Sequence, residues 1–131
     1  MSKHSLAYLG IFFLLLTILS FINIIYSYYF NLYLNVNSYT PTLIISFILS
    51  FFTLQFKNLK IKKLDMFDKI LLVILGYFIL PIIISLPYYF SIYNIPFINS
   101  YFEAISGFTS TGFTIFENIK HIDESLILWR S

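Results

Sequence analysis

Residues 6–30 read LAYLGIFFLLLTILSFINIIYSYYF and contain no charged side chain. About 20 consecutive apolar residues, each rising about 1.5 Å, cross the roughly 30 Å hydrocarbon core of a bilayer. The run exceeds the roughly 7 to 15 apolar residues of a signal peptide, and no small-residue cleavage site follows it. We therefore predict that residues 6–30 form an uncleaved transmembrane helix.

The composition of the whole chain is typical of a membrane protein. Hydrophobic residues make up 59% of the 131 residues and charged residues 11%, with a mean hydropathy of +0.84. A soluble domain, which is roughly half apolar and a quarter charged, could not bury so much apolar surface. The chain has no cysteine, which excludes disulfides, thiolate metal sites and thiol catalysis. The predicted fold class is an all-α membrane protein.

A second apolar run follows an uncharged segment at residues 31–39 that contains three asparagines. This segment suits a short loop. Thr40 and Pro41 then place a capping residue before a proline at the first helical position. We expect the second transmembrane helix to run from there to about Phe56, near the shortest length that spans a bilayer.

A third apolar run begins directly after Asp65, with Asp68 in its first turn. Carboxylates at these positions cap free N–H groups and interact favourably with the positive end of a helix. The predicted helix covers residues 66–90. We expect a kink near Pro81 and the end of regular helix near Pro87, because proline removes a backbone donor.

The basic residues cluster between the second and third helices, and this cluster predicts the orientation of the chain. Positively charged loops stay on the cytoplasmic side of a membrane. The N-terminus is then cytoplasmic as well, whereas residues 31–39 and 91–99 face outside. The lysines concerned are Lys57, Lys60, Lys62, Lys63 and Lys69. We divide the chain into residues 1–64, with two N-terminal helices and the lysine-rich loop, and residues 65–131.

The pattern changes in residues 98–108, which are apolar enough for a membrane but form only about ten residues of helix, too few to cross it. Ser100 and Glu103 form a Ser-x-x-Glu capping box, which predicts where this helix starts and gives Glu103 a helix-start role rather than that of a cation ligand. Gly107 and the polar run 109–114 predict where it ends. A half-length helix followed by a polar segment with glycine indicates a re-entrant pore helix with a filter loop.

Ion coordination is the chemistry that such a loop can perform. Backbone carbonyls of an extended Thr-Ser-Thr-Gly stretch can replace the water shell of K⁺, and glycine permits the dihedral angles that turn successive carbonyls toward one axis. The C-terminal end of the short helix adds a partial negative charge. Both effects favour cations over anions.

Residues 100–114 (SYFEAISGFTSTGFT), followed by residues 126–131 (LILWRS), closely resemble the first pore region of the Trk/Ktr potassium transporters, above all the TrkH type. This resemblance implies potassium uptake through a carbonyl-lined selectivity filter, with K⁺ as the transported ion and no cofactor. It also implies that residues 65–131 are the first helix-pore-helix repeat, with the loop entering the membrane from the outer face.

The resemblance implies a role for each residue of the filter. The carbonyl groups of Ser110 and Thr111 would coordinate K⁺. Gly112 would be the filter glycine, and Phe113 would follow it on the outer side. Ser110 replaces a commoner threonine and Phe113 a commoner small residue, but coordination depends on backbone oxygens, which both substitutions keep.

The family builds its pore from four such repeats in one chain, whereas this sequence ends just as the inner helix of the first repeat begins at Leu126. We therefore expect an N-terminal fragment of a TrkH-type subunit in the cytoplasmic (inner) membrane. The implied partners are the remaining repeats of the transporter, a second subunit in a homodimer, a TrkA-type cytoplasmic nucleotide-binding regulator and the lipid bilayer, but no nucleic acid.

Other interpretations of the same residues remain open. Without the resemblance, residues 106–112 suit a polar linker equally well, in a small structural or assembly membrane protein without transport activity. Arg130 beside Trp129 at a helix start is ordinarily an interfacial anchor, although it could repel cations or brace the filter. His4 and His121 lack partners at ligand spacing, so no metal site other than that for K⁺ is predicted. No catalytic carboxylate pair, activated nucleophile or phosphate loop occurs, so we do not expect an enzyme.

The re-entrant assignment predicts that Asn94 and Glu117 lie on the same, outer side of the membrane. Because the chain has no native cysteine, single cysteines placed at the two positions can be treated with an impermeant maleimide on intact cells. We expect both to be labelled. Labelling of only one from outside would show that the intervening segment crosses the membrane.

Overall fold

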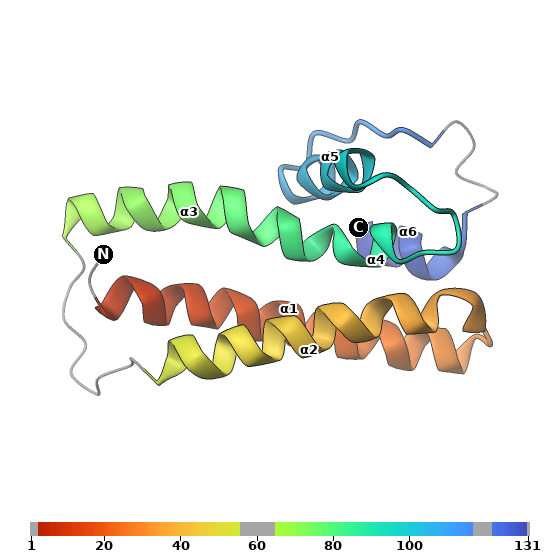
Figure 1. The fold of residues 1–131 in the computed structure, drawn as a ribbon, viewed down its shortest axis with the longest axis horizontal. Helices are drawn as coiled ribbons and strands as arrows, with labels where there is room; N and C mark the ends of the chain where they lie inside the picture. The colour runs from red at the N-terminus through yellow and green to blue at the C-terminus, as the bar shows by residue number, and fades with distance from the viewer. Residues whose placement is uncertain (1–2, 56–64, 117–121, 131) are drawn as a thin grey trace.

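A computed structural model describes residues 3–55, 65–116 and 122–130, with side chains from residue 6 onward. This part of the chain is mainly helical, and no strand occurs in it. The long helices lie side by side (Figure 1) and are α1 (Lys3–Tyr29), α2 (Val36–Leu54) and α3 (Met66–Ile84). The shorter elements are a 3₁₀ helix, η1 (Tyr33–Asn35), and the helices α4 (Leu86–Tyr89), α5 (Phe97–Phe108) and α6 (Glu124–Arg130).

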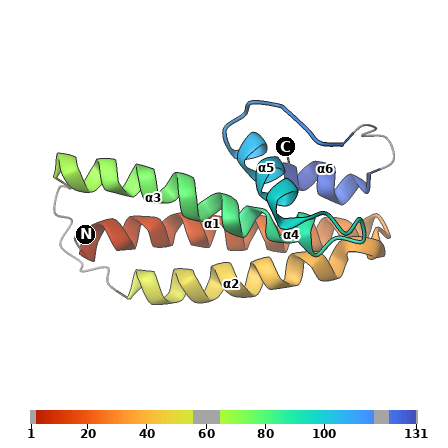
Figure 2. The same ribbon diagram turned by 45° about the horizontal axis from the view of Figure 1, so that its top comes forward.

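The short helices gather at one end of the long ones. The N-terminus and the start of α3 lie at one end of the molecule, whereas α4, α5 and α6 lie toward the other (Figure 1 and Figure 2). Three segments, Leu6–Tyr29, Tyr33–Leu54 and Met66–Tyr89, are each long and apolar enough to cross a membrane. The all-α architecture with three helices of spanning length is therefore confirmed.

The first helix agrees with the sequence prediction, but α2 begins earlier than expected. The predicted loop at residues 31–39 is shorter, because η1 and α2 begin within it, and Pro41 lies inside α2 rather than at its first position. Proline cannot supply the N–H that would pair with the Asn37 carbonyl. The Thr40 hydroxyl donates to that oxygen instead, at 2.9 Å. Thr40 is thus a substitute donor and not a cap.

The third helix begins where the sequence predicts, but α3 ends at Ile84 and a separate helix, α4, covers Leu86–Tyr89 of the predicted run. α3 begins directly after Asp65, which occupies the N-cap position without a capping hydrogen bond to its side chain. Pro81 lies inside α3, and the interruption of regular helix falls beyond it, at Ser85. α4 then ends directly before Phe90, as expected. Pro87 occupies one of the first two positions of α4, where a missing N–H costs little.

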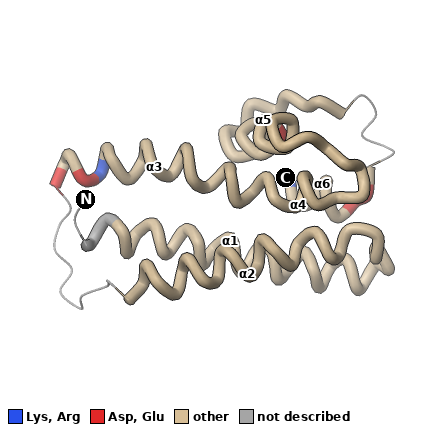
Figure 3. The backbone as a smooth tube through the Cα atoms, in the orientation of Figure 1, with Lys and Arg blue, Asp and Glu red and all other residues tan. Residues whose placement is uncertain are grey.

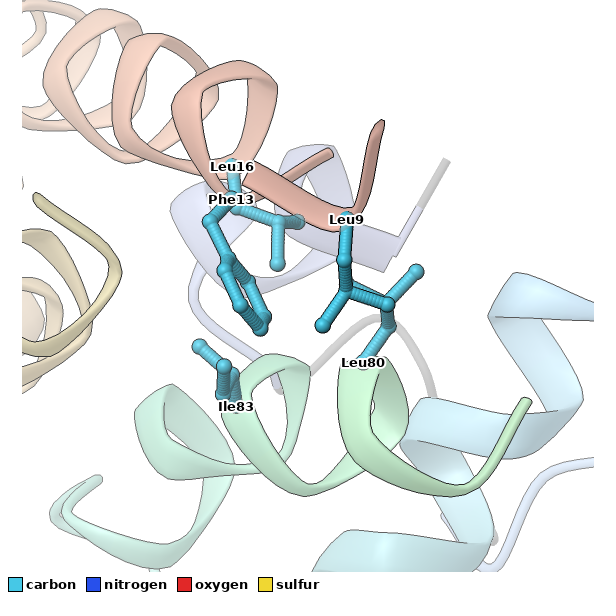
Figure 4. Close-up of a cluster of buried hydrophobic side chains, with 5 residues drawn as sticks. All are labelled: Leu9, Phe13, Leu16, Leu80 and Ile83. Carbon is cyan, nitrogen blue, oxygen red and sulfur yellow. The ribbon is translucent and has the colours of Figure 1, made fainter. Parts of the chain in front are cut away.

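Apolar side chains join α1 to α3. Leu9, Phe13 and Leu16 of α1 meet Leu80 and Ile83 of α3, and each is at most 6% exposed (Figure 4). The members on each helix are spaced by three or four positions, which places them on one helical face. Many apolar side chains on the other faces of these helices are exposed, as expected for surfaces that contact lipid.

α1 and α2 meet along small and hydroxyl-bearing side chains. Thr17 Oγ1 donates to Ser46 Oγ across the interface at 3.0 Å. Ser50 Oγ donates to the Gly10 carbonyl at 3.2 Å. Helices in membranes associate through such close packing and interhelical hydrogen bonds, because lipid tails are as apolar as the side chains. At Gly10 the two helices are so close that an added Cβ would clash with Thr53 Oγ1.

Charged side chains are rare along the helices. The sequence carries no Lys, Arg, Asp or Glu in residues 6–55 or in residues 70–102. In the described part, Figure 3 shows charges near the helix ends and in α5, where Glu103 lies. A charged side chain in such apolar surroundings requires a partner. The basic residues Lys57, Lys60, Lys62 and Lys63, which predict the orientation, and His121 lie outside the described residues.

We expect Gly10→Ala to destabilise the protein by about 1 to 3 kcal/mol, because the added methyl group overpacks the interface between α1 and α2. Gly76→Ala in α3 is the matched control, since a Cβ there would meet only Leu80 Cδ1, at 3.9 Å. The control gains helix propensity and is expected to be neutral or up to about 1 kcal/mol more stable. Equilibrium unfolding in mixed detergent micelles, followed by circular dichroism, measures both. Equal stability of the two variants would contradict the close approach of α1 and α2.

Candidate functional site

α5 has 12 residues and is about 18 Å long, little more than half the hydrocarbon thickness of a bilayer. It begins at Phe97, with Pro96 at the N-cap position and no capping side chain. The predicted capping box is therefore wrong, because the helix starts before it. Ser100 Oγ reaches the Ile95 carbonyl at 3.4 Å, and Glu103 lies in the middle of the helix.

A Schellman motif closes the C-terminal end of α5. The Thr111 amide donates to the Ser106 carbonyl at 3.0 Å, and the Ser110 amide donates to the Gly107 carbonyl at 3.0 Å. Ser110 has the left-handed backbone conformation, with φ of 56°, that this motif requires. The polar run thus ends the helix as predicted, with serine at the position that glycine usually occupies.

Beyond Thr111 the chain runs back along α5 toward the end of the molecule where α5 begins (Figure 1). Gly112 has φ of +77°, and a Cβ added there would meet no atom within 4 Å. The left-handed backbone, and not a lack of space, therefore favours glycine at this position. The left-handed φ agrees with the choice of glycine, and its role in turning successive carbonyls toward one axis stays a prediction.

The Glu103 carboxylate holds the returning segment. Its side chain is completely buried, although it is the only charged residue between Lys69 and Glu117. Its Oε1 accepts a hydrogen bond from the Thr114 hydroxyl at 2.7 Å and from the Ile115 amide at 2.5 Å. Hydrogen bonds to a charged group are roughly twice as strong as those between neutral groups. Glu103 thereby ties the middle of α5 to the loop that follows it.

Arg130, at the C-terminal end of α6, also holds the loop. Its Nη2 donates to the carbonyl of Phe113 at 2.8 Å and to that of Gly112 at 3.3 Å. Its Nε lies 3.4 Å from Glu103 Oε2 in an ion pair. α6 approaches α5 closely at Gly107, where an added Cβ would lie 3.2 Å from the Arg130 carbonyl. These contacts favour the alternative interpretation, in which Arg130 braces the loop, because its guanidinium group bridges the carboxylate and the loop.

The four residues predicted to form the filter, Ser110 to Phe113, lie together in this loop, but their carbonyl groups fall into two pairs. Those of Gly112 and Phe113 accept hydrogen bonds from Arg130. Those of Ser110 and Thr111 accept none from the described residues. Within this part of the chain, the Ser110 and Thr111 oxygens thus differ from those of Gly112 and Phe113 in having no hydrogen-bond donor.

Polar side chains hold the start of α6 against α1 and α2. Asn35 Nδ2 donates to Asp123 Oδ2 at 2.9 Å. The hydroxyl groups of Tyr39 and Ser125 lie 2.8 Å apart. Asn23 Nδ2 donates to the Ser125 carbonyl at 3.1 Å, a contact between residues 102 positions apart. Sequence reasoning missed these contacts, and the only signal was the presence of amide and hydroxyl groups on otherwise apolar helices.

An open pocket of about 370 Å³ lies between α1, the end of α3, α4, α5 and α6, beside Glu103 and Arg130. Its wall is mainly apolar and also includes Asn23. The buried oxygens Asn23 Oδ1 and Glu103 Oε2 have no hydrogen-bond donor among the described residues. The ion pair with Arg130 is therefore the interaction that compensates the charge on Oε2.

The amino-acid sequence is similar to that of a protein named as a transporter. The chain is 28% identical over 102 residues to a protein of Methanocaldococcus jannaschii that is named an uncharacterized cation transporter. The aligned part covers 77% of this chain but only 22% of that protein, so the chain corresponds to about a fifth of the relative's length. No family model matches the chain, and no solved structure matches it.

Ser110→Gly and Ser110→Ala remove the same hydroxyl group, so their difference reports the left-handed backbone at this position. We expect the glycine variant to be more stable by about 1 kcal/mol, because a Cβ in the left-handed region costs roughly 1 to 2 kcal/mol. Equilibrium unfolding in mixed detergent micelles measures the difference. Equal stability of the two variants would contradict the Schellman motif at the end of α5.

Proposed function

We propose that this chain forms one repeat of a cation pore and takes part in potassium uptake across the cytoplasmic membrane. The short helix α5 supports the proposal, because its C-terminal end leads into the loop and directs a partial negative charge there. The similarity to a protein named as a cation transporter supports cation transport in general. The choice of K⁺ depends on the resemblance of residues 100–114 to the Trk/Ktr pore region.

The observation that carries the proposal is the path of α5 and its loop. A helix of 12 residues cannot cross a bilayer, and the chain after it returns toward the end where the helix began. Irregular backbone at membrane depth is tolerated only where it is buried in protein or lines a water-filled cavity. A re-entrant loop of this kind can expose backbone carbonyls to a cation that has lost its water.

In this proposal the residues of the loop have separate roles. The carbonyl groups of Ser110 and Thr111 coordinate K⁺. Gly112 follows them in the chain and supplies a residue with left-handed backbone conformation. Phe113, a residue that is 70% exposed, follows on the outer side. One loop supplies only part of an ion cage, so further repeats must complete it. The relative is long enough to contain them, because the aligned part is 22% of its length.

The remaining features of the proposal concern the whole transporter. From the lysine cluster we infer a cytoplasmic N-terminus and a loop that enters from the outer face, because positively charged loops stay on the cytoplasmic side. A homodimer and a TrkA-type cytoplasmic nucleotide-binding regulator are the partners that the family resemblance implies.

Substitutions at Gly112 test the proposal in the complete gene product, expressed in a host that lacks its own potassium uptake. Because an added Cβ meets no atom within 4 Å, backbone conformation rather than side-chain size determines the effect. Asparagine adopts the left-handed region more readily than serine. We expect growth at low potassium, and the K⁺ to Na⁺ flux ratio, to fall from wild type to Gly112→Asn to Gly112→Ser. The serine variant should lose roughly tenfold in K⁺ flux, since about 1.4 kcal/mol of strain corresponds to tenfold.

An immunoblot of the membrane fraction provides the control for abundance. Unchanged growth and flux ratio in Gly112→Ser, at wild-type abundance, would contradict the filter assignment. A structural or assembly role for the chain would then be the better explanation.

A further inference from the structure

The electrostatics of the loop depend on Glu103 and Arg130, because residues 104–116 contain no charged side chain. The Glu103 side chain is completely buried, and that of Arg130 is 19% exposed. Their charged groups carry opposite charges and lie 3.4 Å apart, so the two charges sum to zero. As a unit, the pair presents no net charge to the nearby carbonyl groups.

The Arg130 guanidinium group also separates oxygen atoms that would otherwise face one another. It contacts the carbonyl oxygens of Gly112 and Phe113 on one side and Glu103 Oε2 on the other. Without it, Glu103 Oε2 and the carbonyl oxygens of Gly112 and Phe113 would border the vacated space, and the Phe113 oxygen would keep its hydrogen bond from Ser106 Oγ. Carboxylate and carbonyl oxygens are the ligands that Ca²⁺ prefers, in a flexible arrangement. The guanidinium group therefore occupies a position that would otherwise suit a divalent cation.

We propose that Arg130 is a specificity-determining residue that keeps divalent cations out of the loop, by neutralising Glu103 and by occupying the space between its carboxylate and the two carbonyls. The proposal rests on the proposed function, because it requires a flux of monovalent cations through the loop. Arg130 acts as a positioning residue, whose forked donors hold two carbonyls and pair with a carboxylate at the same time.

Inhibition of monovalent flux by Ca²⁺ tests this role. The complete gene product is reconstituted in vesicles, with Rb⁺ as the tracer. Ca²⁺ is the better probe because Mg²⁺ gives up its water reluctantly. Arg130→Gln exposes the Glu103 charge, and we expect the Ca²⁺ concentration that halves the flux to fall by about tenfold or more. Arg130→Lys keeps a positive charge, so its Ca²⁺ sensitivity should stay within about threefold of wild type.

The double variant Glu103→Gln/Arg130→Gln is the matched control. It lacks both charges, so we expect it to lose the Ca²⁺ sensitivity of Arg130→Gln. A purely structural role for Arg130 would lower the flux in both variants but would not create a Ca²⁺ block that the second substitution removes. Equal Ca²⁺ sensitivity of wild type and Arg130→Gln, or of the single and double variants, would overturn the proposal.

Two further outcomes are decisive. If Arg130→Gln does not accumulate in the membrane, Arg130→Met repeats the test with a more apolar side chain. If neither Arg130→Gln nor Arg130→Met accumulates while Arg130→Lys does, the positive charge is needed for folding. That result would overturn the specificity role of Arg130. Absence of monovalent flux in the wild-type protein would overturn the proposed function as well, whereas normal flux with unchanged Ca²⁺ block would overturn only the role of Arg130.

Discussion

Burial of the Glu103 carboxylate is the constraint on which the loop depends. Removing a carboxylate from water costs several kcal/mol unless hydrogen bonds and an opposite charge compensate. Thr114 and Ile115 of the loop supply the hydrogen bonds, and Arg130 of α6 supplies the charge. Because these groups come from separate parts of the chain, the carboxylate is stabilised only when α5, the loop and α6 are assembled. The backbone of the loop is thereby coupled to the position of α6.

The three long helices provide the framework that positions α6. At its start, Asp123 accepts a hydrogen bond from Asn35 at 2.9 Å, and near its end Trp129 Nε1 donates to the Ile84 carbonyl at 3.0 Å. These contacts connect α6 to the segment before α2 and to α3. Interhelical hydrogen bonds of this type are effective in a bilayer, where apolar contact alone does not distinguish a neighbouring helix from lipid. The buried polar residues therefore specify which helices are neighbours, a choice that apolar contact alone does not determine.

The sequence predicted the long helices well, because an apolar run and the thickness of a bilayer are sufficient to define a spanning helix. It predicted the starts of α2 and α5 less well. Thr40 before Pro41 reads as a helix start, but the same hydroxyl can serve a carbonyl inside a helix, as it does for Asn37. Ser100 and Glu103 likewise have the spacing of a capping box, whereas Pro96 begins the helix one turn earlier. In both cases the same local pattern is compatible with two structures.

By itself, the sequence determined an all-helical architecture, a half-length helix ended by a polar run, and a glycine at position 112 where the backbone is left-handed. These features depend on hydrophobicity and on the conformational preferences of neighbouring residues, which are local properties. Only the tertiary structure decided that Glu103 pairs with Arg130, and that the Gly112 and Phe113 carbonyls are hydrogen-bonded while those of Ser110 and Thr111 accept no hydrogen bond from the described residues. A buried charge needs a partner but does not specify which one, because the partner is the group that folding brings within reach.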